Sequence, residues 1–126
     1  LAVNLSSGLN GPEGRPWRAT YKTLARVFPN VRIFVGARAA PGLFNVLFFA
    51  SSGSLDAPAS AAPADARAAV AQMLTLELTP RPADATEMSV VTEMTDDYAP
   101  LDSLLAATAV RARRLLQEEM PEILLR

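Results

Sequence analysis

The residues with the clearest potential for chemistry are an acidic and aromatic cluster, Asp96, Asp97 and Tyr98. Carboxylates hold cationic substrates, and a carboxylate beside an amine can also accept or relay its proton. A neighbouring tyrosine would close a pocket over such a cation. The same residues also fit a turn that leads into a helix, because Asp favours turns and Pro100 and Asp102 follow. The turn is the simpler interpretation, and both stay open at this point.

A second polar group, Asn4, Ser6 and Ser7, stands at the end of a short apolar run, residues 1–5 (LAVNL). Such a run is typical of a buried parallel strand. Ligands of open α/β sheets bind beyond the carboxyl ends of the strands. Asn4 is therefore a candidate contact to a substrate or cofactor, and simple solvation of a loop is the alternative.

The composition excludes several classes of site. The 126 residues contain no Cys and no His, which removes cysteine nucleophiles, Cys/His zinc sites and imidazole acid–base catalysis. We predict no metal site. Lys and Arg number 12 and Asp and Glu 13, so the chain has no excess of positive charge for binding nucleic acid. No apolar run approaches the roughly 18 residues of a membrane span, and no signal peptide is visible, so we expect a cytoplasmic location.

The first half of the chain contains one strong helix signal. Four apolar or aromatic side chains recur at helical spacing and so share one helix face, away from Arg18: Trp17, Tyr21, Leu24 and Phe28. A proline fits the first turn of this helix, and another proline directly after it ends it. We expect the face to pack in the core rather than to form a stacking surface for a ligand.

Two strand signals follow this helix. Residues 31–35 show the alternation of a strand with one face partly exposed, and residues 44–50 form a nearly continuous apolar run. A Pro41-Gly42 turn joins them, and two strands with a short connection are most simply antiparallel. Together with the strand over residues 1–5 and the helix that crosses back, they predict an α/β fold, a mostly parallel sheet that ends in an antiparallel hairpin.

The second half of the chain has a mainly helical pattern. Residues 52–64 are rich in Ser, Ala and Pro and indicate a linker. Helices are expected over residues 66–76 and 103–119. Asp65 is expected to cap the first of them, and an aspartate also precedes the second. Between the helices, residues 89–91 fit a short strand or an extended link.

Four segments resemble the spermidine synthase-like group, also called polyamine aminopropyltransferases: LAVNL, LARVFPNVRIFVG, LFNVLFFASS and TDDYAPLDSLL. The first three resemble the fifth strand, the next helix with the sixth strand, and the seventh strand of a class I S-adenosylmethionine-type Rossmann-like domain. The resemblance implies the carboxyl-terminal half of such a sheet, whose seventh strand lies antiparallel beside the fifth. Residues 1–51 would be its closing strands and helix, 52–64 a linker, and 65–126 a mainly helical extension of the same domain.

The resemblance implies an activity for a parent protein rather than for this chain alone. The family transfers an aminopropyl group from decarboxylated S-adenosylmethionine to an amine. Asp96, Asp97 and Tyr98 are then candidate substrate-binding residues, together with Asn4 from its position. The glycine-rich turn and the acidic loop that hold the nucleotide and the reacting amine belong to the half before residue 1. No catalytic residue is therefore assigned, and we expect the isolated chain to be inactive and not to bind S-adenosyl compounds.

One loop departs from the family pattern. True spermidine synthases carry Tyr-Pro-x-Gly between their last two strands, whereas this loop is Ala39-Ala40-Pro41-Gly42, with Ala40 in the Tyr position. Two alternatives stay open. One is a non-catalytic module that binds a nucleoside or polyamine or accompanies a transporter-like region, and the other is an S-adenosylmethionine-dependent methyltransferase. We also expect the isolated chain to expose the apolar edge of residues 1–5, which would pair with itself in a homodimer or aggregate.

Overall fold

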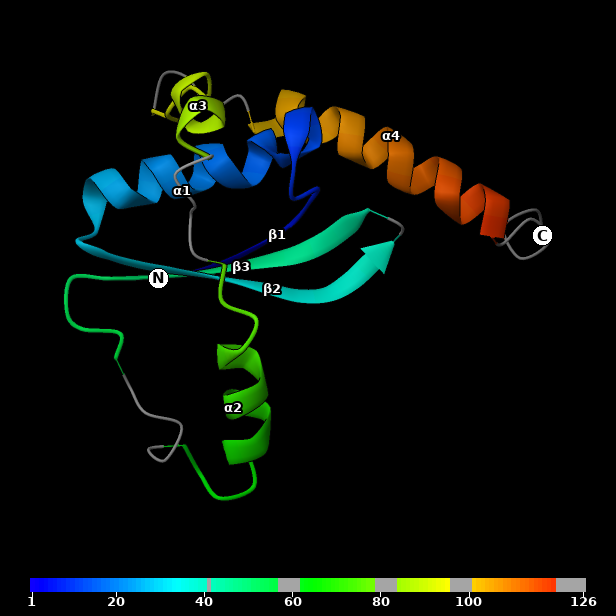
Figure 1. The fold of residues 1–126 in the computed structure, drawn as a ribbon. Helices are drawn as coiled ribbons and strands as arrows, with labels where there is room; N and C mark the ends of the chain where they lie inside the picture. The colour runs from blue at the N-terminus through cyan, green and yellow to red at the C-terminus, as the bar shows by residue number, and fades with distance from the viewer. Residues whose placement is uncertain (41, 57–61, 79–83, 96–100, 120–126) are drawn as a thin grey trace.

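The computed structural model describes the chain except residues 41, 57–61, 79–83, 96–100 and 120–126. Three strands and several helices follow one another along it (Figure 1). In chain order they are β1 (Ala2–Ser7), η1 (Gly11–Gly14), α1 (Arg15–Val27), β2 (Asn30–Ala40), β3 (Leu43–Ser51), α2 (Arg67–Leu74), α3 (Asp84–Ser89) and α4 (Leu101–Glu119). The chain therefore has a mixed α/β fold.

The strands form one sheet in the order β1-β3-β2, with β3 antiparallel to both neighbours. β1 and β2 therefore run parallel to each other, and α1 crosses between them. In the register of the sheet, Val3 of β1 and Ile33 of β2 both lie opposite Phe48 of β3. The expected antiparallel hairpin is confirmed, although its two strands are longer than expected. The expectation of a mostly parallel sheet is not met among the described strands, because both strand pairs are antiparallel and β1 alternates between exposed and more buried residues. Pro41 of the expected turn lies outside the described residues, and Gly42, with a φ of 76°, leads into β3.

The core lies between the sheet and α1. Val46 and Phe48 of the central strand are fully buried there, and full burial of such a side chain contributes about 1.5–3 kcal/mol. The expected apolar face of α1 is confirmed, since all four of its residues belong to this core or pack against it: Trp17, Tyr21, Leu24 and Phe28. The helical spacing in the sequence therefore identified the side of α1 that faces the sheet.

The opposite face of the sheet is covered in part by α2 (Figure 1). Phe34 of β2 and Phe49 of β3 meet on this face edge to face, with ring centroids 5.7 Å apart. Val70 and Met73 of α2 line a hollow together with these two rings. Because α1, α3 and α4 lie on the other side, the sheet forms a layer between helices (Figure 1).

A segment after α2 closes the outer edge of β2. The Leu76 carbonyl accepts a hydrogen bond from the Val35 amide at 2.9 Å, and the Leu78 amide donates one to the Ile33 carbonyl at 2.8 Å. The backbone of β2 thus has partners on both sides, β3 on one and this segment on the other.

An ion pair on the same edge predicts pH-dependent stability. Arg32 donates to the Glu77 carboxylate at 2.8 and 2.6 Å, and this hydrogen bonding lowers the pKa of Glu77 from its ordinary 4.5. The folded carboxylate therefore holds its proton less tightly than the unfolded one, so the contribution is complete above about pH 4.5 and is lost as the pH falls further. We expect Glu77→Gln to lower the free energy of unfolding by roughly 0.2–1 kcal/mol at neutral pH, because the pair is partly exposed.

Urea unfolding at neutral pH and at about pH 3 tests this prediction, since the difference between Glu77→Gln and the native chain should shrink in acid. Glu118→Gln, at an exposed position of α4, is the matched control and should change little at either pH. A loss for Glu77→Gln of the same size at both pH values would contradict the role of the ion pair.

The expected helix caps in the second half of the chain are wrong. α2 is shorter than expected, and its N-cap is Ala66, without a side-chain cap hydrogen bond, rather than Asp65. The turn before it is closed by the backbone instead, because the Ala66 amide donates to the Pro63 carbonyl at 2.9 Å. α4 begins at Leu101, so Asp102 lies inside its first turn and not before it.

Of the two structures expected for residues 89–91, a short strand or an extended link, the strand does not form. Ser89 ends α3, and its hydroxyl donates to the Thr86 carbonyl at 2.7 Å, which closes the last helical turn. Val91 is buried although no strand forms there, and its carbonyl accepts a hydrogen bond from Lys22 Nζ of α1 at 2.9 Å. The valine pair that indicates a strand therefore belongs to a link packed against α1.

Candidate functional site

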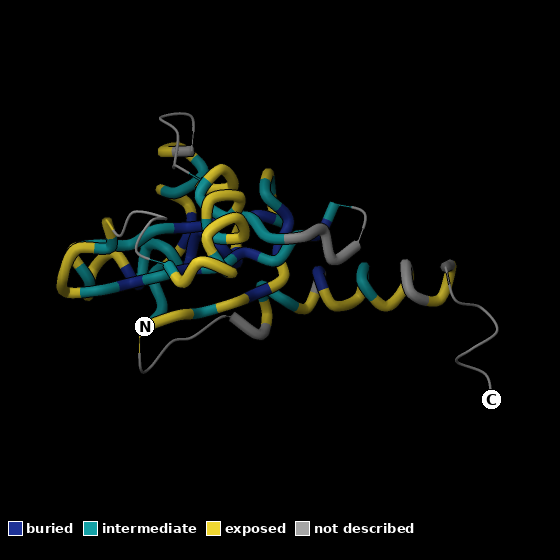
Figure 2. Tube along the Cα trace, turned by 90° about the horizontal axis from the view of Figure 1, so that it is seen from below, coloured by how far each residue is buried: buried dark blue, intermediate teal, exposed yellow. Residues whose placement is uncertain are grey.

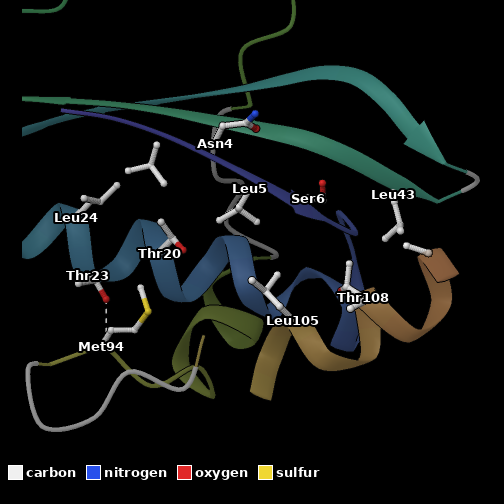
Figure 3. A pocket seen from close by; sticks show the side chains of 13 residues that line it. Asn4, Leu5, Ser6, Thr20, Thr23, Leu24, Leu43, Met94, Leu105 and Thr108 are labelled. Atoms are coloured by element: carbon white, nitrogen blue, oxygen red, sulfur yellow. Dashed lines mark hydrogen bonds between the residues drawn. The ribbon is translucent and has the colours of Figure 1, made fainter. Parts of the chain in front are cut away.

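An apolar groove of about 600 Å³ lies between β1, α1 and α4, and we call it the β1 groove. Its side chains come from elements far apart in the sequence (Figure 3). Six of them are Asn4, Leu5, Thr20, Leu24, Leu105 and Thr108. Met94, in the link before α4, also lines it. The fold thus creates a groove whose lining no single stretch of sequence contains.

The periods of the strand and the helices bring these side chains to one groove. Leu5 faces α1 because alternate residues of β1 are buried on that side. Thr20 and Leu24 are one turn apart on α1, and Leu105 and Thr108 are three residues apart on α4, so each pair shares a helix face. The lining therefore follows from regular secondary structure and needs no unusual backbone.

Two threonine hydroxyls of the β1 groove are already engaged. Thr20 donates to the Pro16 carbonyl at 3.0 Å, and Thr23 donates to the Ala19 carbonyl at 2.9 Å. The Thr23 oxygen also accepts a hydrogen bond from the Met94 amide at 2.9 Å, drawn as a dashed line in Figure 3. This last bond fastens the link before α4 to α1.

Thr108 differs from these two residues. Its side chain is buried, and its hydroxyl has no hydrogen-bond partner among the described residues. A buried hydroxyl left unpaired costs about 1–3 kcal/mol. The β1 groove therefore contains one buried hydroxyl that has no hydrogen-bond partner in the described part of the fold.

Replacing Thr108 with valine should stabilise the chain. The two side chains have almost the same shape, and valine removes the unpaired hydroxyl, so we expect the free energy of unfolding to rise by about 1 kcal/mol. Thr108→Ala removes the same hydroxyl but leaves a gap beside Leu105, so it should not stabilise. Urea unfolding measures both. A less stable Thr108→Val would mean that the hydroxyl has a partner in solution.

The structure separates the polar residues predicted at the end of β1. Asn4 is exposed and borders the β1 groove, but its side chain points away from α1 (Figure 3), because Leu5 and not its neighbour faces that helix. Ser7 is buried, and its hydroxyl lies 2.9 and 3.1 Å from the carbonyls of Gly8 and Glu13. Ser7 therefore holds the loop after β1 and does not line the β1 groove.

The predicted acidic cluster, Asp96, Asp97 and Tyr98, lies outside the described residues. In the sequence it stands between Met94 and Leu105, both of which line the β1 groove. The described residues that line the groove include no Asp, Glu, Lys or Arg. Apolar contacts with a few hydroxyl and amide groups suit binding of an uncharged surface rather than acid–base chemistry.

Sequence reasoning missed a buried cation beside the core. Arg18 is 1% exposed, although its position lies off the apolar face of α1. Its guanidinium donates to the carbonyls of Leu9 at 3.2 Å and Gly11 at 3.4 Å, lies 4.7 Å from the ring centre of Trp17, and forms an ion pair with Glu87. These contacts tie the loop after β1 and α3 to α1, so Arg18 is a structural residue.

No protein-family model matches the chain, and no curated protein and no solved structure matches it. No helix in the described ranges is long and apolar enough to cross a membrane. Within those ranges, no three His, Cys, Asp or Glu side chains come together as metal ligands.

Proposed function

We propose that the chain is the closing half of a class I Rossmann-like domain of the spermidine synthase-like group. Its parent protein would transfer an aminopropyl group from decarboxylated S-adenosylmethionine to an amine, in the cytoplasm and without a metal. One observation carries the proposal, the insertion of β3 antiparallel between β1 and β2, which are parallel to each other and joined by α1. The resemblance implies this same arrangement of its fifth, sixth and seventh strands.

The proposed reaction is a displacement at carbon. The deprotonated acceptor amine attacks the aminopropyl carbon next to the sulfonium, a C–N bond forms, the C–S bond breaks, and the sulfur leaves as a neutral thioether. Asp96 and Asp97 would hold the ammonium group of the amine and accept the proton that it loses, and Tyr98 would close the pocket. Asn4, exposed at the border of the groove on the side of β1 away from α1, would supply a polar contact to the substrate.

A non-catalytic binding module is the second candidate function. The uncharged lining of the β1 groove favours it, because an apolar surface with few polar groups suits part of a nucleoside or of a partner chain better than a polyamine. Ala40 also stands where the family carries the tyrosine of the amine pocket. In this case the parent would bind a ligand without transferring a group.

The test is an assay of the parent protein, expressed from the complete reading frame that encodes this chain. Decarboxylated S-adenosylmethionine and S-adenosylmethionine are each supplied with putrescine, and mass spectrometry identifies the products. We expect an aminopropylated amine, and a loss of at least about tenfold in kcat/KM for Asp96→Asn and Asp97→Asn. Asp102→Asn removes a nearby carboxylate in α4 and is the control, and its kcat/KM should stay close to the native value.

Other products would decide against the proposed activity. A methylated product from S-adenosylmethionine would assign a methyltransferase. No product from either donor, together with saturable binding of spermidine or a nucleoside in calorimetry, would favour the binding module.

A further inference from the structure

The outer edge of β2 holds a short extended segment of the same chain, residues 76–78 (LEL). This segment runs antiparallel to β2, and Glu77 lies opposite Phe34 in the bridge between them. Two backbone hydrogen bonds flank the bridge, at 2.9 and 2.8 Å. Addition of an extended segment to the edge of a sheet is a common mode of peptide recognition, in which backbone bonds give affinity and side chains give specificity.

One side chain of β2 selects the middle residue of this segment. Arg32 donates to both oxygens of the Glu77 carboxylate, at 2.8 and 2.6 Å, and its guanidinium lies 5.3 Å from the ring centre of Phe34. The planar guanidinium matches a carboxylate in two-point geometry. The neighbours of Glu77 direct their side chains to the other face of the sheet, where Leu78 packs against the core. The edge therefore favours an acidic residue between two apolar ones.

The segment is the end of a strap, residues 62–78, that has few contacts with the rest of the fold. None of these residues is buried, and Figure 2, seen from the side of α2, shows that helix in the colours of exposed and intermediate residues. A hollow of about 180 Å³ remains between Val70 and Met73 of α2 and the rings of Phe34 and Phe49. Elements with few buried apolar contacts open at a free energy well below that of global unfolding.

We propose that the outer edge of β2 is a docking site for an extended segment with a carboxylate between two apolar residues, and that the strap occupies this site in cis. Opening of the strap removes the partners of the Val35 amide and the Ile33 carbonyl and uncovers the ring of Phe34, a residue that is 3% exposed. A segment of the same pattern from a partner protein then forms the same backbone bonds and the same ion pair with Arg32. The inference does not depend on the proposed function.

Amide hydrogen exchange of the native chain tests whether the strap opens separately from the core. The Val35 amide donates to the strap, whereas the neighbouring Phe34 amide points to β3, where Phe34 pairs with Leu47. We expect the protection factor of the Val35 amide to be at least about tenfold lower than that of the Phe34 amide. Equal protection of the two amides would overturn the proposal, because the strap would then open only when the whole chain unfolds.

A disulfide that locks the strap is the control for this measurement, since the native chain contains no Cys. Val35 and Leu76 lie opposite each other, one position from the bridge, and such residues have Cα atoms about 5.5 Å apart, within the range of a disulfide. In a chain with Val35→Cys and Leu76→Cys, oxidation should raise the protection of the Leu78 amide at least about fivefold, and reduction should reverse the change. The same protection in both redox states would contradict the opening.

Two peptides test the docking site, LTLELT with the sequence of residues 74–79 and LTLKLT with the central charge reversed. The host is a Glu77→Lys chain, whose own strap is repelled by Arg32. The strap of the native chain competes at an effective concentration on the order of millimolar. Nuclear magnetic resonance of the Val35 amide follows each titration, and we expect a Kd for LTLELT at least about fivefold lower than for LTLKLT. In an Arg32→Glu chain, whose Glu77 is also repelled, this preference should reverse.

Absence of binding at millimolar peptide, or equal Kd values for the two peptides, would overturn the docking site. Glu118→Lys makes the same charge change at an exposed position of α4 and should bind LTLELT no better than the native chain does. Circular dichroism and the fluorescence of Trp17 check that each variant is folded. Failure of the aminopropyl transfer assay would leave these results unaffected.

Discussion

Replacing Trp17 with alanine is expected to lower the free energy of unfolding by about 3–5 kcal/mol. The indole is 1% exposed in the core, and its Nε1–H donates to the Leu9 carbonyl at 3.1 Å. The guanidinium of Arg18 lies over the indole, 4.7 Å from the ring centre. Truncation would leave a cavity and remove both contacts. Because small domains are stable by only about 5–15 kcal/mol in total, the variant should unfold at much lower urea concentrations.

Far-ultraviolet circular dichroism should follow this unfolding, because Trp17 is the single tryptophan and its fluorescence is lost in the variant. Trp17→Phe keeps an aromatic ring in the core, so its free energy of unfolding should fall less than that of Trp17→Ala. Val27→Ala, at a position that is 69% exposed, should stay within about 0.5 kcal/mol of the native chain. A loss below about 1 kcal/mol for Trp17→Ala would mean that the core is not organised around α1.

The elements predicted correctly from the sequence are those whose pattern is local. The face of α1 and the hairpin of β2 and β3 follow from periods of 3.6 and 2 residues, which side chains display whatever else the chain does. The prediction of the helix cap was wrong because it also used only local sequence. Asp65 fits a cap in isolation, but the Ala66 amide closes that turn with a backbone hydrogen bond instead. For residues 89–91 the sequence left a strand and a link open, because the burial of Val91 comes from packing near α1 and not from a sheet.

The candidate site could be predicted only in part. Asn4, which borders the groove, was a candidate because polar residues at a strand end have a general meaning in α/β sheets. Thr20 and Thr108 carry no such signal, since they line one groove only after α4 has packed beside α1 and β1. Arg18 is similar, because its burial depends on Glu87 of α3 and on carbonyls of the loop after β1. Contacts between distant segments are not encoded by the spacing of neighbouring residues.

Replacing Gly14 with alanine is the second large effect that we expect. Gly14 has φ −85° and ψ −4°, an ordinary conformation for any residue, so the need for glycine is one of space. A Cβ there would lie 2.8 Å from the Leu9 carbonyl oxygen and closer still to Nη1 of Arg18. Leu9 cannot yield easily, because its carbonyl accepts hydrogen bonds from both Trp17 and Arg18. We expect a loss of about 1–3 kcal/mol in the free energy of unfolding.

A double-mutant cycle separates the two clashes of this added methyl group. In an Arg18→Ala background one of the obstacles is gone, so Gly14→Ala should cost less than in the native chain, with a coupling of roughly 0.5–3 kcal/mol. Gly53→Ala is the matched control, because a Cβ there meets Ser51 Oγ at an ordinary 3.8 Å. Equal costs for Gly14→Ala in both backgrounds would assign the clash to the Leu9 backbone alone. Unequal costs would show that the buried guanidinium requires glycine at position 14, since its place beside the loop after β1 leaves no room for a methyl group.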